Sequence, residues 1–297
     1  MALLLTMGSL SVADPDDIST TSSPTAHSSL SDHDQFNARD ADVIFQSSDG
    51  VRFHLHRTNL GVITGAFPGA ELDTRDEVVH LAEPARVLEI LFQYVYPKRH
   101  PDLENLDFQL LAELAEAVEK YEVFPAMNTC VTRLRHYTPQ HPLETLVHGI
   151  KHDYPKLIDT AAPHLIMSPL VAICEKLPLV CIVPWLRFYS YTREAIFGAA
   201  RSFIDRKGRY SSCHAGDDEI CNQCRSCVLA WIADLEKIES REALQAALMK
   251  YQDYPRFEYC SKCSYACMHM PGVAKMCEEA LTAIRSFSSF LTGERLA

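Results

Sequence analysis

Residues 42–60 read Asp-Val-Ile-Phe-Gln-Ser-Ser-Asp-Gly-Val-Arg-Phe-His-Leu-His-Arg-Thr-Asn-Leu, and this stretch defines the fold of the first half of the chain. Two apolar runs, 43–45 and 51–55, flank the dipeptide Asp49-Gly50. Because Gly adopts positive φ without steric cost and Asp tolerates it, this dipeptide predicts a hairpin turn. Apolar and polar side chains alternate over residues 51–56, the period of a strand with one buried face. The stretch therefore predicts a β-hairpin.

The hydrophobic period changes directly after this hairpin. The side chains of Leu60, Ile63, Thr64 and Phe67 have the i, i+3, i+4, i+7 spacing of a helix that buries one face. A further helix is predicted to begin at Pro84, because the N–H that proline lacks would be unpaired in a first turn anyway. The periods alone indicate a small α+β unit with no chemistry of its own.

Another amphipathic helix is predicted over residues 110–121, with Asp107 as its N-cap. Glu113, Glu116 and Lys120 are expected to face water on this helix. Glu116 and Lys120 are also expected to form an i, i+4 pair worth about 0.2–0.5 kcal/mol. We interpret these side chains as a solvated helix face rather than as part of a site.

Several blocks over residues 40–136 resemble the BTB/POZ domain in their order and spacing, and they are similar to the BTB proteins expanded in mushroom-forming (basidiomycete) fungi. The blocks are Asp42-Val43, Ser47-Ser48-Asp49-Gly50-Val51, Phe53, His56, Leu60, Val78-Val79-His80-Leu81, Glu83-Pro84 and Tyr94-Val95-Tyr96-Pro97. The resemblance implies an α+β fold over residues 39–137, in which helices flank a short mixed sheet.

The regions on either side of this unit have a different character. Residues 1–38 are rich in Ser, Thr and Asp and hold no Lys or Arg, so they are expected to form a disordered tail. Residues 2–13 resemble a short secretory signal without its basic start, and we favour an intracellular protein, cytoplasmic or nuclear. Residues 138–297 are expected to form an α-helical domain. Its helices are predicted at residues 143–151, 156–166, 170–177, 192–205, 228–238, 241–251 and 276–291.

Residues 177–186 are the most apolar segment of the chain. The segment is shorter than the roughly 18 apolar residues that a membrane span needs. Pro178 and Pro184 indicate a short piece of buried core instead. No transmembrane segment and no membrane partner are therefore expected.

The net charge of −11 comes entirely from residues 1–140. Phosphate binding needs clustered Lys and Arg, and the chain has no such cluster. Binding to nucleic acid is therefore not expected.

Eight of the eleven cysteines fall in residues 213–277 and include two Cys-x-x-Cys pairs. Each pair can supply two thiolates to a tetrahedral zinc ion, and an intracellular chain favours metal over disulfides. The hypothesis is one structural zinc ion held by Cys221, Cys224, Cys260 and Cys263. Reserve ligands are Cys213, His214, Cys227, Cys267 and His269. Unliganded thiols, disulfides and redox chemistry stay open as alternatives, and Cys130, Cys174 and Cys181 are interpreted as core residues.

The sequence contains no phosphate-binding Gly-rich loop, no nucleophile elbow and no His-Glu-x-x-His motif. A zinc ion with four thiolate ligands is closed to substrate. The chain is therefore expected not to be an enzyme, and no cofactor other than structural zinc is expected.

The BTB/POZ resemblance implies protein–protein association, either as a homodimer or with another protein. Asp42 aligns with the acidic member of a charged pocket at the dimer interface of some members, and His54 occupies the position of its basic partner. A histidine would hold that pairing only when protonated. The alternative is that Asp42 caps a strand and His54 is solvated.

Two other functions remain as alternatives. Some BTB/POZ members are substrate adaptors of cullin ubiquitin ligases and carry a large apolar residue two positions before a Glu. Here Gly69 precedes Glu71 at that spacing, which argues against the adaptor role. The second alternative is a metal or redox sensor that works through the cysteine cluster.

Overall fold

The predicted hairpin forms from β2 (Val43–Gln46) and β3 (Val51–Leu55). The two strands pair antiparallel, with Phe45 opposite Phe53, and both of these rings are buried. Gly50 in the turn has φ 91°, a backbone conformation that side chains with a Cβ rarely adopt. The turn predicted from Asp49-Gly50 is therefore confirmed.

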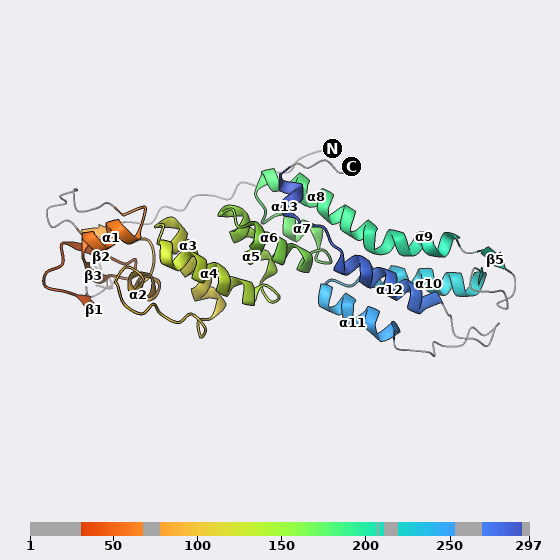
Figure 1. The fold of residues 1–297 in the computed structure, drawn as a ribbon, viewed down its shortest axis with the longest axis horizontal. Helices are drawn as coiled ribbons and strands as arrows, with labels where there is room; N and C mark the ends of the chain where they lie inside the picture. The colour runs from red at the N-terminus through yellow and green to blue at the C-terminus, as the bar shows by residue number, and fades with distance from the viewer. Residues whose placement is uncertain (1–30, 68–77, 207, 211–218, 253–268, 293–297) are drawn as a thin grey trace, which may run out of the picture.

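The computed structural model describes residues 31–67, 78–206, 208–210, 219–252 and 269–292. This part of the chain has a mixed α+β fold that is mostly helical. Figure 1 shows an elongated molecule with the sheet at one end and α9 to α12 at the other. Among the described helices, none combines the length and the apolar character needed to cross a membrane.

The hairpin belongs to a four-stranded mixed sheet with the order β1-β3-β2-β4. The outer strands are β1 (Ser31–Asn37) and β4 (Val78–His80), and each pairs parallel with its neighbour. β1 lies inside the segment expected to be a disordered tail, so that expectation is wrong for residues 31–37. Phe36 is only 7% exposed and packs against Phe53 and Phe92. A single apolar anchor among polar residues gives no periodic signal, which is why the strand was not predicted.

Four helices complete the first half: α1 (Arg57–Ile63), α2 (Ala85–Gln93), α3 (Phe108–Lys120) and α4 (Phe124–Tyr137). Pro84 immediately precedes α2 as its N-cap. Asp107 caps α3 as predicted, since its carboxylate accepts a hydrogen bond of 2.9 Å from the N–H of Leu110. The buried faces of the four helices and the sheet share one aromatic-rich core.

The second half is mainly helical, which agrees with the prediction. Its elements are α5 (Pro142–Lys151), α6 (Pro155–Ala161), the 3₁₀ turn η1 (Ala162–His164), α7 (Leu170–Cys174), α8 (Leu179–Arg193), the π-helical turn η2 (Glu194–Gly198), α9 (Ala199–Arg206), β5 (Gly208–Tyr210), β6 (Glu219–Cys221), α10 (Asn222–Leu235), α11 (Arg241–Gln252), α12 (His269–Thr282) and α13 (Ser288–Leu291). β5 and β6 form a small parallel pair. Trp185, Phe188 and Phe287 lie at the centre of the core of this half.

The most apolar segment, residues 177–186, is not simply buried core as expected. α8 runs through Pro184 and buries Cys181, Trp185 and Phe188 on one face. On the opposite face Leu179 is 84% exposed and Val180 is 83% exposed. Apolar side chains on both faces of the helix gave the pattern of a fully buried segment, although only one face is buried.

The two halves are in direct contact through α5 and α6, which pack against α4. Leu157 on α6 is fully buried and belongs to the core of the first half. The boundary expected at residues 137 and 138 therefore falls inside continuous packing.

Candidate functional site

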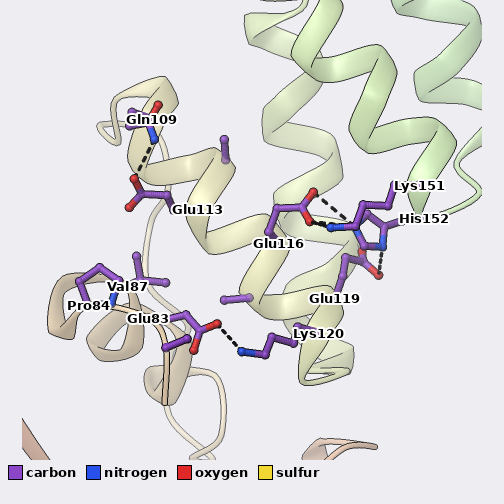
Figure 2. A pocket seen from close by; sticks show the side chains of 13 residues that line it. Glu83, Pro84, Val87, Gln109, Glu113, Glu116, Glu119, Lys120, Lys151 and His152 are labelled. Atoms are coloured by element: carbon purple, nitrogen blue, oxygen red, sulfur yellow. Dashed lines mark hydrogen bonds and ion pairs between the residues drawn. The ribbon is translucent and has the colours of Figure 1, made fainter. Parts of the chain in front are cut away.

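A pocket of about 730 Å³ lies where the first half meets the second. Its wall comes from the segment that enters α2, from one face of α3, and from the carboxyl end of α5 (Figure 2). The charged side chains around it are Glu83, Glu113, Glu116, Glu119, Lys120, Lys151 and His152. Both signs of charge therefore line a pocket formed by elements far apart in the sequence.

Glu116 on α3 is at the centre of the polar contacts between the halves. Its Oε1 lies 2.8 Å from Nδ1 of His148, and both of its carboxylate oxygens lie 3.3 Å from Nε2 of His152. The Nζ of Lys151 also donates a hydrogen bond to Oε2 of Glu116. These three partners belong to the last turn and the C-cap of α5. One carboxylate thus joins α3 to the end of α5.

The surroundings of Glu116 keep it ionised. Partial burial on its own would raise the pKa of this carboxyl. The hydrogen bonds from Lys151, His148 and His152 outweigh burial and lower the pKa to about 2. Glu116 is therefore a carboxylate throughout the ordinary pH range.

His148 is a nearly buried histidine, with an exposed fraction of 7%. Burial disfavours its charged form and lowers its pKa below 6.5, although Glu116 opposes this shift. Its Nδ1 faces Glu116, while its Nε2 is buried without a hydrogen-bond partner. The neutral imidazole carries its proton on Nδ1, which donates to the Glu116 carboxylate, so a bound cation would have to replace that proton at Nδ1.

Glu119 lies on the side of His152 that is turned away from Glu116. Its carboxylate is almost fully buried and accepts a hydrogen bond from the hydroxyl of Tyr154. Its Oε2 lies 3.9 Å from Nδ1 of His152, on the side of the ring away from Glu116. His152 is therefore placed between two carboxylates, as Figure 2 shows.

The opposite side of the pocket has a separate ion pair. Nζ of Lys120 lies 2.8 Å from Oε1 of Glu83, whose Oε2 accepts a hydrogen bond of 2.5 Å from the Tyr121 hydroxyl. Burial would raise the pKa of Glu83, but the hydrogen bonds from Lys120 and Tyr121 lower it below 4.5. This pair fixes α3 to the segment before α2.

The expected pairing of Glu116 with Lys120 is wrong, because the two side chains bind different partners on opposite sides of the pocket (Figure 2). The sequence of α3 predicts a solvated position for Glu116 because it does not reveal that α5 packs beside it. One signal was available: His148 and His152 are four residues apart and share a helix face.

Chemically, the cluster resembles a partial metal-binding set. Glu116, His148 and His152 each offer one ligand atom, and these atoms lie within 4.8 Å of one another. A carboxylate and two imidazoles form a donor set that binds divalent ions in proteins.

The structure gives Asp42 and His54 different partners. Oδ1 of Asp42 accepts a hydrogen bond of 2.7 Å from the N–H of Arg57, at the first residue of α1. His54 lies on the strand beside β1, with Nε2 3.2 Å from Oδ1 of Asp32. Asp42 thus caps a helix within its own chain, and the dimer pocket predicted for this pair stays a prediction.

Most of the predicted zinc site lies beyond what the structure describes. The side chains of Cys221, Cys224 and His269 are not described, although their backbones lie in β6, α10 and α12. Outside the described residues are Cys213, His214, Cys260, Cys263 and Cys267, together with Gly69 and Glu71 of the cullin-type segment. Cys227 is a free, exposed thiol on α10. The zinc hypothesis for this cluster therefore stays a prediction.

Cys130 and Cys181 are buried as expected of core residues, whereas Cys174 is only partly buried. Cys277 is buried, and its Sγ donates to the carbonyl oxygen of Ile196. Burial raises the pKa of both Cys277 and Cys130 to about 12. Such thiols are poor nucleophiles at neutral pH.

Comparison with known proteins does not assign the chain to a family. No family model matches the sequence, and no curated protein matches it significantly.

Proposed function

We propose that the protein is a protein–protein interaction scaffold whose first partner is a second copy of itself. The BTB/POZ resemblance of residues 39–137 supports this proposal, because that fold serves protein association. The observation that carries it lies in the other half of the chain, on the outer face of α8.

This outer face is the α8 surface, defined here as Leu179, Val180, Val183, Leu186 and Tyr191. All five side chains are exposed, from 84% at Leu179 to 39% at Tyr191, and they follow one side of the helix. A shallow pocket lies along the same side, between Val183 and Ala195. Contiguous exposed apolar side chains of this kind mark interaction sites on soluble proteins.

The sequence of α8 matches itself in an antiparallel pairing. In a two-fold dimer, positions equidistant from the axis face each other. With the axis near Trp185, Leu179 faces the partner's Tyr191, and Val183 faces the aliphatic part of the partner's Arg187. These pairings place apolar groups against each other along the α8 surface, which favours a second copy as the occupant.

The size of a stable interface sets a further expectation. Such interfaces bury about 800 Å² on each partner, more than one helix face supplies. Val171 on α7 is also exposed and apolar, and it precedes α8 by a few residues. We expect α7 to contribute to the interface.

The test measures the mass of the full chain in solution by light scattering during size-exclusion chromatography. The wild type is expected to be a dimer, and Val183→Glu is expected to be a monomer because it buries a charge at the centre of the interface. Met249→Glu is the matched control, since Met249 is an equally exposed apolar residue on α11. It should remain a dimer.

A monomeric wild type over the micromolar range would overturn self-association. A dimer that tolerates Val183→Glu would instead exclude the α8 surface as its interface.

A further inference from the structure

The cluster at the junction of the two halves has the donors of a metal site and lies between two helices. Glu116 projects from α3, and His148 and His152 project from successive turns at the end of α5. The i, i+4 spacing places both imidazoles on one side of the helix, facing the carboxylate. Two helices that pack together therefore bring the three donors to one point.

The three donor atoms lie within 4.8 Å of one another. Nδ1 of His148 and Nε2 of His152 lie 2.8 Å and 3.3 Å from oxygens of Glu116. Nitrogen and oxygen ligands bind zinc at about 2.0–2.2 Å, so neighbouring ligand atoms in a tetrahedral shell are slightly over 3 Å apart. The 2.8 Å separation is a hydrogen-bond distance, so an ion would have to push these two side chains apart.

A second observation points the same way. Oε2 of Glu119 lies 3.9 Å from the ring nitrogen of His152 that is turned away from Glu116, which is longer than a hydrogen bond. Metal-bound histidines usually donate their second ring N–H to a carboxylate in this position, which orients the ring. The hydroxyl of Tyr154 holds Glu119 in this position. The cluster thus has three candidate ligands, and Glu119 and Tyr154 surround one of them.

The ammonium of Lys151 competes with a bound cation for the carboxylate of Glu116. Its ammonium donates to Oε2 of Glu116, but the side chain itself is largely exposed. An exposed lysine can move into water when a divalent ion takes over the carboxylate. Its charge would nevertheless oppose binding, so its removal should favour the ion.

We propose that Glu116, His148 and His152 form a binding site for a single zinc-like divalent cation, which joins α3 to α5. Two imidazoles and one carboxylate favour Zn²⁺, Co²⁺ or Ni²⁺ over Mg²⁺ and Ca²⁺. The fourth position is left for water, because Glu116 and His152 also line the pocket. This site is separate from the predicted cysteine cluster, and it does not depend on self-association.

The test uses Co²⁺ as the probe on the full chain, after chelator treatment and desalting under reducing conditions. Absorption distinguishes the two sites, because thiolate ligands give intense charge-transfer bands in the near ultraviolet and nitrogen and oxygen ligands do not. Bound Co²⁺ is counted by equilibrium dialysis. We expect one equivalent that adds no thiolate band, whatever the cysteines bind.

Three variants test whether that equivalent of Co²⁺ is bound by Glu116, His148 and His152. His152→Gln should abolish it, and Glu119→Gln should weaken it by about 10-fold to 100-fold as an outer-layer change. Lys151→Gln should bind Co²⁺ more tightly than the wild type. His164→Gln is the matched control, because His164 also pairs with a glutamate, Glu242, at 2.7 Å. It should bind as the wild type does.

Circular dichroism of each variant reports whether its helices are intact. The near-ultraviolet bands report whether the cysteines still bind Co²⁺ as they do in the wild type. His152 is partly exposed, and His152→Gln should retain the wild-type helical signal. The proposal is overturned if the folded wild type binds no Co²⁺ beyond the thiolate-ligated equivalents. It is also overturned if His152→Gln and His164→Gln bind the same number of equivalents.

Discussion

Asp159 and Ser288 are joined by two hydrogen bonds, although they lie on helices from opposite ends of the second half. The N–H of Ser288 donates to Oδ1 of Asp159 at 2.8 Å, and its hydroxyl donates to Oδ2 at 2.7 Å. Ser288 is the first residue of α13, whose early N–H groups have no partner within the helix. The carboxylate on α6 therefore serves as a cap for a helix more than a hundred residues away.

Replacement of Asp159 should destabilise the protein measurably. Asp159→Ala leaves a partly buried N–H and hydroxyl without their acceptor, and we expect it to lower the free energy of unfolding by about 1–3 kcal/mol. Asp159→Asn keeps one carbonyl oxygen as an acceptor and should lose less. Urea unfolding followed by circular dichroism measures both. Asp234→Ala is the control, since Asp234 forms an exposed pair with Lys237 and should change stability by less than about 0.5 kcal/mol.

β1 is expected to be an integral part of the sheet. Phe36→Ala removes a buried ring that packs against Phe53 and Phe92, and it should cost roughly 3 kcal/mol. Phe124→Ala makes the same chemical change at a ring that is 54% exposed and should stay within about 0.5 kcal/mol of the wild type. Equal losses in the two variants would show that β1 does not pack as described.

Two glycines are expected to respond in opposite directions to the same substitution. Gly50→Ala places a Cβ on a residue with φ 91° and should destabilise by about 1–2 kcal/mol. Gly272→Ala lies within α12, where an added Cβ meets no atom of the described residues within 4 Å, and it should stabilise by about 0.5–1 kcal/mol. Thermal unfolding midpoints of the two variants should therefore lie on either side of the wild-type value.

Stability should fall as the pH is lowered, in two stages. The pKa of His148 lies below 6.5 in the folded state, so the unfolded state takes up this proton first as the pH falls through 6.5. The pKa of Glu116 is about 2 when folded and 4.5 ordinarily, so its contribution is complete above pH 4.5 and is lost toward pH 2.

Urea unfolding at a series of pH values tests this expectation. Asp49 and Glu83 also have lowered pKa values, so the informative quantity is the difference between the wild type and Glu116→Gln. The variant should lose less stability than the wild type below pH 4.5. Parallel curves would contradict the role assigned to Glu116.

Local sequence patterns predicted the elements that are stabilised locally. The Asp49-Gly50 turn and the Asp107 cap depend on backbone geometry within a few residues, and both are present. β1 could not be predicted in this way, because its hydrogen bonds come from β3 and its anchor is a single ring. The Glu116 cluster also escaped prediction, since its donors come from α3 and α5 and only packing brings them together.

The burial of Leu157 determines how short a fragment of the chain can be and still fold by itself. Its side chain fills the core of residues 39–137 from α6, so a fragment ending at residue 137 would leave a hole the size of a leucine in that core. Removal of a buried leucine costs about 2–5 kcal/mol, a large share of the stability of a small domain. The smallest autonomous piece should therefore extend through Ala161, and the two halves should melt in one cooperative transition.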